Sequence, residues 1–118
     1  MGALLYGGSD IEVKFEDRVL AHLQVVIGAK LRRREGFFFT WRDDISVGDG
    51  RSAVWIDPAI PLYFRYSGSK SPAINREWIE LLTLSANSTQ GLHLMDEPAG
   101  PNSAGAPGKS KDNSVKPG

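Results

Sequence analysis

Cysteine is absent from this chain of 118 residues. Disulfides, thiolate metal ligands and cysteine nucleophiles are therefore excluded. Net charge is also lacking, because 14 lysines and arginines balance 14 aspartates and glutamates, so no whole-molecule field attracts nucleic acid or an anionic membrane. The longest apolar run, at 25–29, is far shorter than the roughly 20 residues of a membrane span. With no basic leader before an apolar stretch, we expect a cytoplasmic protein without a membrane partner.

The chain does contain enough apolar side chains for one core. Hydrophobic residues make up 41% of it, and every aromatic residue lies before position 97. From Glu97 onward, glycine, proline, serine and lysine dominate, and such a segment buries too little apolar surface to offset its ordering entropy. We predict a single domain over residues 1–96 and a disordered tail over residues 97–118.

Hydrophobic periodicity predicts the element order ββαβββαβ. The predicted strands lie at 3–6, 11–15, 37–41, 52–57, 62–66 and 92–96, and the predicted helices at 17–34 and 72–87. Ser71 is the expected cap of the second helix and Pro72 its first turn. Short links between the middle three strands indicate an antiparallel meander. We expect an α+β fold in which about six antiparallel strands form a sheet with both helices mainly on one face.

Large side chains occupy more positions than one core face can cover. In the predicted meander, two opposite faces both carry aromatic residues, and the first helix is apolar well beyond one stripe. We therefore expect an interface with a second copy of the chain or with another protein. The candidate interface residues are Val25, Phe38, Trp55, Tyr63 and Arg65. Exposed aromatics mixed with arginine are also typical of surfaces that stack single-stranded nucleic acid, which leaves a nucleic-acid partner as an alternative.

Basic residues at the end of the first predicted helix are candidate phosphate contacts: Arg32, Arg33 and Arg34. The alternative is a solvated cap, because cations at a helix C-terminus are stabilised by the helix dipole.

A loop rich in carboxylates is a candidate site for a divalent cation, through Asp43, Asp44 and Asp49. The spacing fits no calcium loop, and ion pairing with Arg42 or Arg51 in a hairpin turn explains the same residues.

The motifs of common enzyme classes are missing. The glycines at 48 and 50 lack the third glycine of a dinucleotide fingerprint, and no Gly-x-Ser-x-Gly segment occurs. The two histidines, His22 and His93, fit no metal-ligand spacing, and we expect each at the surface or half-buried. We predict no catalytic residue, no cofactor site and no metal ligand, and the sequence leaves open only whether the loop with Asp43, Asp44 and Asp49 binds a cation.

The segment LAHLQVVIGAKLRRREGFFFTW at 20–41, followed by VGDGR, WIDPAIPL, INREW and ANSTQGL, resembles a family of short, uncharacterised bacterial proteins. The likeness covers residues 1–97. Members of that family often carry the label ATP-dependent DNA ligase, so the resemblance implies a ligase-related activity. Ligases of that kind attack ATP with the lysine of a Lys-x-Asp-Gly motif. The only Asp-Gly here is Asp49-Gly50, and Val47 stands where that lysine is required.

We therefore favour a non-catalytic binding module, self-associating or protein-binding. The alternatives are a nucleic-acid-associated accessory module and the ligase-related activity that the resemblance implies.

Overall fold

The computed structural model describes residues 1–8, 10–43, 48 and 50–99. The elements are β1 (Gly2–Tyr6), β2 (Ile11–Phe15), α1 (Asp17–Arg32), β3 (Phe37–Arg42), β4 (Arg51–Ile56), β5 (Leu62–Arg65), α2 (Arg76–Ala86) and β6 (Leu92–His93). The α+β class and the order ββαβββαβ are confirmed. Most of the predicted tail, residues 100–118, lies outside the described residues.

The strands form two sheets, where the sequence predicted one. The first sheet has the order β2-β1-β5 and the second the order β4-β3-β6. All pairings are antiparallel except that of β6 with β3, which is parallel. The predicted meander is therefore wrong at its third strand, because β5 pairs with β1 and not with β4.

The link between β4 and β5 explains this partner exchange. The Asp57 carboxylate closes a turn by accepting a hydrogen bond from the backbone N–H of Ala59 at 2.8 Å. Pro58 and Pro61, both within the link, have no N–H to donate to a neighbouring strand. Pro61 instead accepts the N–H of Gly7 at 2.9 Å, at the end of β1. The Tyr6 hydroxyl donates to Trp55 O and accepts from Asp57 N, both at 2.8 Å, so it ties the two sheets together.

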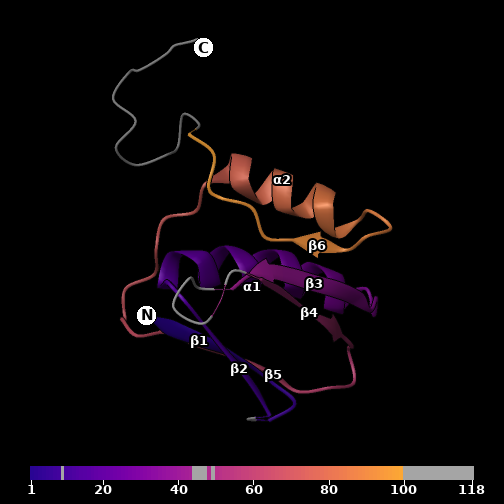
Figure 1. Cartoon of the computed structure of the whole chain (residues 1–118). Coiled ribbons are helices and arrows are strands. Elements are labelled where there is room, and N and C mark those ends of the chain that lie inside the picture. Colours follow the sequence, from indigo (N-terminus) through magenta and orange to yellow (C-terminus); the bar gives the residue numbers. More distant parts are fainter. Residues whose placement is uncertain (9, 44–47, 49, 100–118) are drawn as a thin grey trace.

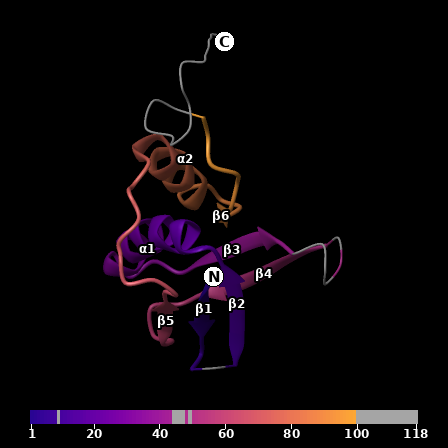
Figure 2. The ribbon, with the colours of Figure 1, turned by 90° about the vertical axis from the view of Figure 1, so that its left-hand side faces the viewer.

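Figures 1 and 2 show α2 and β6 at one end of the molecule, the β2-β1-β5 sheet at the other, and α1 with β3 and β4 between them. One apolar cluster runs through all of these layers. It takes Leu4 from β1, Leu23 from α1, Phe39 from β3 and Leu82 from α2, each at most 2% exposed. A single continuous core is what a domain of this size requires.

The second helix starts later than predicted. Ser71 and Pro72 precede it without regular structure, and Asn75 is the N-cap, with its side chain accepting the N–H groups of Glu77 at 3.0 Å and Trp78 at 3.3 Å. Asparagine is among the best N-cap residues, so the signal was present in the sequence.

Among the described residues, no helix combines the length and the apolar character that crossing a lipid bilayer requires.

Candidate functional site

An exposed aromatic pair lies on the outer surface of the β4-β3-β6 sheet. Phe38 and Trp55 are cross-strand partners and remain 51% and 47% exposed. Their ring centroids are 5.1 Å apart with an interplanar angle of 73°, an edge-to-face arrangement. The missing side chain of Gly36 makes room for the tryptophan, because a Cβ there would lie 2.6 Å from Trp55 Cζ2. The pair is thus held in a defined position while half of each ring is open to solvent.

The remaining outward positions of this sheet complete a surface that we call the aromatic face. Strand alternation puts the neighbours of Phe38 and Trp55 on the side away from the buried Phe37, Phe39 and Ile56. The aromatic face consists of Phe38, Thr40 and Arg42 from β3, Arg51, Ala53 and Trp55 from β4, and His93 from β6. None of these residues is acidic, and two are arginines. The face therefore combines apolar rings with positive charge.

Two other interface candidates lie elsewhere. Tyr63 and Arg65 belong to β5 in the other sheet, where Tyr63 is 58% exposed and Arg65 lies 3.4 Å from the Glu12 carboxylate. The expectation that these two share a sheet surface with Phe38 and Trp55 is wrong, for the reason given above: β5 leaves the meander to pair with β1.

Val25 and Arg32 line a separate groove of about 450 Å³ between α1 and the segment before α2. Val25 is 45% exposed, and Ile74 on the opposite side is 40% exposed. Leu81 on α2 is exposed to a similar extent, at 39%. The groove lining also includes Tyr66 and Gln24, and the Tyr66 hydroxyl donates to Gln24 Oε1 at 2.7 Å.

The other two arginines of the basic run stabilise the end of α1. Arg33 contacts the Glu35 carboxylate at 3.4 Å, and Lys30 contacts it at 2.8 Å. Lys30 first and Arg33 second hold the pKa of Glu35 below its ordinary value. Arg34 has a φ of 61°, the left-handed conformation that commonly ends a helix. These contacts match a helix cap, and a phosphate contact by Arg32, Arg33 or Arg34 stays a prediction.

The third candidate, the aspartate loop, is described only in part. Asp43 accepts a hydrogen bond from Ser52 Oγ at 2.8 Å, whereas Asp44 and Asp49 lie outside the described residues. Within the described ranges, no group of three or more histidine or carboxylate side chains is close enough to hold a metal ion.

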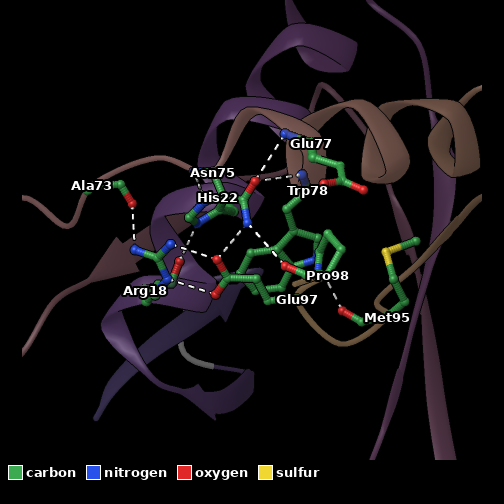
Figure 3. A network of polar contacts seen from close by, with 9 residues as sticks. All are labelled: Arg18, His22, Ala73, Asn75, Glu77, Trp78, Met95, Glu97 and Pro98. Atoms are coloured by element: carbon green, nitrogen blue, oxygen red, sulfur yellow. Dashed lines mark hydrogen bonds and ion pairs between the residues drawn. The ribbon is translucent and has the colours of Figure 1, made fainter. Parts of the chain in front are cut away.

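The most extensive polar network joins residues that are far apart in the sequence (Figure 3). We call it the polar clasp and define it as Arg18, His22, Asn75 and Glu97. The Arg18 guanidinium donates twice to Glu97, from Nε at 2.8 Å and from Nη2 at 2.6 Å. Asn75 Nδ2 donates to the same carboxylate at 2.8 Å. Arg18, and then Asn75, lower the pKa of Glu97 to about 2. The clasp joins α1, the start of α2 and the segment after β6.

The histidine of the clasp is fully buried, and the expectation of a surface or half-buried His22 is wrong. His22 lies beside Leu23 on the apolar stripe of α1, and this position indicated burial. Its Nδ1 is 2.7 Å from the carbonyl oxygen of Arg18, and its Nε2 accepts the N–H of Asn75 at 2.8 Å. Because the carbonyl only accepts, Nδ1 carries the proton and the ring is neutral. Burial lowers the pKa of His22 below 6.5.

This geometry decides what the clasp can do chemically. A general base needs a free lone pair within reach of a substrate proton, but both nitrogens of His22 are already engaged and its ring stacks 4.5 Å from that of Trp78. A cavity of about 240 Å³ lies beside Arg18, Trp78 and Glu97, and the charged groups of Arg18 and Glu97 are paired with each other. The clasp binds elements of the fold to one another.

The clasp also extends the packed chain beyond its predicted end. Glu97, expected as the first residue of the tail, is held by three hydrogen bonds. A family model described as a domain of unknown function, DUF7882, matches residues 1–97 and so includes this residue. The chain belongs to the DUF7882 family. The resemblance to an uncharacterised family is thereby confirmed, while the match to DUF7882 gives no support to the ligase label. No curated protein and no solved structure matches the chain.

Proposed function

We propose that this DUF7882 chain is a non-catalytic binding module that contacts another protein chain through the aromatic face. The observation that carries the proposal is the half-exposed Phe38–Trp55 pair, which lies on the β4-β3-β6 sheet and is uncovered by either helix in the described part of the chain. Tryptophan and arginine are the residue types that most often dominate binding energy at protein interfaces. Rings already held in place lose little conformational entropy on binding.

The ionisable groups of the clasp support a non-catalytic role. The most strongly shifted carboxylate, Glu97, is paired with Arg18, and the buried histidine has no free ring nitrogen. Perturbed pKa values occur at active sites but also in structural networks. Here the network joins α1, the start of α2 and the segment after β6, which favours the structural interpretation.

A nucleic-acid partner is the second candidate, and one observation favours it. Arg42 and Arg51 share the aromatic face with the two rings, a combination found in single-strand binding sheets. Against it stands the balanced charge of the whole chain. Phosphate contacts supply most of the non-specific affinity for nucleic acid, and they need a surplus of positive charge.

The proposal is tested by photo-crosslinking from the centre of the aromatic face. A photoreactive amino acid replaces exposed Ala53 in one variant and exposed Glu80, on α2, in the matched control. Both variants are expressed at native level and irradiated in the cell. We expect discrete protein adducts from position 53 that are absent from position 80. Adducts destroyed by nuclease would replace the proposal with the nucleic-acid candidate, and adducts that are absent or equal at both positions would overturn it.

The non-catalytic part of the proposal has its own test. The purified chain is incubated with labelled ATP and magnesium, and covalent adenylate is measured after denaturation. We expect none, because Val47 occupies the place of the nucleophilic lysine. A stable protein-bound adenylate would overturn this part of the proposal and favour the ligase-related activity.

A further inference from the structure

The aromatic face is ordered in three rows along the strands. Each row is a cross-strand pair of β3 and β4: Phe38 with Trp55, Thr40 with Ala53, and Arg42 with Arg51. Successive rows on one face are two residues apart, or about 7 Å, since a strand rises about 3.4 Å per residue. The aromatic row and the arginine row therefore lie at equal distances on either side of a row of small residues. Such a pattern is complementary to itself when it is reversed.

We infer that the aromatic face binds the same face of a second copy of this chain, with the strands reversed, about a twofold axis that runs over the Thr40–Ala53 row. This inference rests on the proposed function and names its partner. A twofold interface uses the same patch on both subunits, so the patch must complement itself. Reversal brings Arg51 of each copy over Trp55 of the other, and Arg42 over Phe38.

Charge favours stacking the two copies with reversed strands over stacking them with aligned strands. Arg42 and Arg51 are directly opposite each other on neighbouring strands, and like charges in that position repel. Stacking the copies with aligned strands would bring four arginines together. Reversing them places each guanidinium over an aromatic ring, where cation–π attraction replaces repulsion. The chain as a whole has no net charge, so two copies do not repel at long range.

The shape of the face agrees with the same arrangement. Packed sheets lie about 10 Å apart, and their facing side chains must interdigitate. Small residues in the central row, Thr40 and Ala53, allow that approach, while the large side chains stand at the two ends. Trp55 is already supported by Gly36 and Phe38, and so it needs little rearrangement to accept a guanidinium.

Sedimentation equilibrium of the purified full chain measures the association directly. We expect a monomer–dimer equilibrium in which Trp55→Ala and Arg51→Glu each weaken the dimer at least tenfold, because each change removes two symmetric contacts. Arg76→Glu and Leu84→Ala alter exposed α2 residues and should leave it unchanged. Unfolding midpoints of all four variants verify that they are folded. A parent that stays monomeric at millimolar concentration, or a dimer that both face variants leave intact, would overturn the inference.

The lack of cysteine allows a geometric test. In Ala53→Cys the two thiols lie close together across the twofold axis, and a short bis-maleimide should join them, whereas Glu80→Cys on α2 should stay monomeric. Equal cross-linking of both variants would place the contact elsewhere and overturn the inference. The two proposals can fail separately. If the parent is monomeric but photo-crosslinking at position 53 captures a different protein, the binding module stands and its self-association falls.

Discussion

The Arg18–Glu97 pair makes a quantitative prediction about stability. Replacing Glu97 with glutamine keeps the shape of the side chain and removes its charge. The pKa of Glu97 falls from 4.5 to about 2 in the folded chain, and a full difference of that size corresponds to about 3 kcal/mol. Both side chains retain contact with water, at 29% and 22% exposure, and solvent screens the interaction. We expect Glu97→Gln to lower the free energy of unfolding by about 1–2 kcal/mol at pH 7.

The pH dependence gives the prediction a distinctive signature. A carboxylate whose pKa is depressed by folding contributes stability above its unfolded pKa and loses it as the pH falls through its folded pKa. The difference between parent and Glu97→Gln should therefore be constant above about pH 5.5, shrink below pH 4.5, and approach zero near pH 2. Comparing two proteins at each pH cancels the titration of all other groups.

Urea unfolding followed by tryptophan fluorescence provides the measurement, since Trp78 packs inside the same network. Glu80→Gln is the matched control, because Glu80 is an exposed glutamate of α2 and no ion pair joins it to the described residues. The reasoning fails if Glu97→Gln costs no more than Glu80→Gln at pH 7. It also fails if the cost is the same at pH 3 as at pH 7, since the charge would then not be its source.

Three further predictions concern the core and α1. Because burial lowers the pKa of His22, the imidazole is protonated in the unfolded chain at a higher pH than in the folded chain, and the free energy of unfolding should fall as the pH drops below 6.5, by at most about 1.4 kcal/mol per pH unit. Urea titrations at pH 7.5 and 5.5 should show a smaller fall for His22→Gln than for the parent. An equal fall in both proteins would contradict the assignment. A Cβ at helical Gly28 would meet no atom within 4 Å, so Gly28→Ala should raise the unfolding free energy by about 0.5–1 kcal/mol, whereas a lower melting temperature would refute this. Leu82→Ala should lower the free energy of unfolding by about 2–5 kcal/mol and Leu84→Ala by less than about 0.5 kcal/mol, because Leu82 is fully buried and Leu84 is 72% exposed. Equal losses in chemical denaturation would contradict the packing of α2.

The candidate surfaces were only partly predictable. Alternation along β3 and β4 correctly put Phe38 and Trp55 on the same face, because a period of two fixes which side chains share a face, but it left open which of the two faces is exposed. The same rule could not decide which strand lies beside which. Tyr63 has the same phase in its strand as Trp55, yet it lies in the other sheet. The strand that β5 pairs with depends on the turn at Asp57 and on the contacts of the Tyr6 hydroxyl, which together direct the chain toward β1.

The clasp was the larger omission. Arg18 and Glu97 are 79 residues apart, and His22 and Asn75 are 53 apart. Local sequence patterns carry no information about contacts between residues so far apart in the sequence. The composition assigned Glu97 to the tail, because the residues after it are mostly proline, glycine and small polar residues. One carboxylate does not change the average composition of such a segment.

The amino-acid sequence by itself determined the order of elements, the apolar stripe of α1 and the phases of the strands, because these follow from interactions within a few residues. Tertiary structure alone decided the division into two sheets, the hydrogen bond between His22 and Asn75, and the capture of Glu97 by Arg18. Each of these depends on contacts between segments that are distant in the sequence, and no local sequence pattern pairs those segments. Local periodicity specifies which side of an element is apolar, and only the packed chain specifies what covers that side.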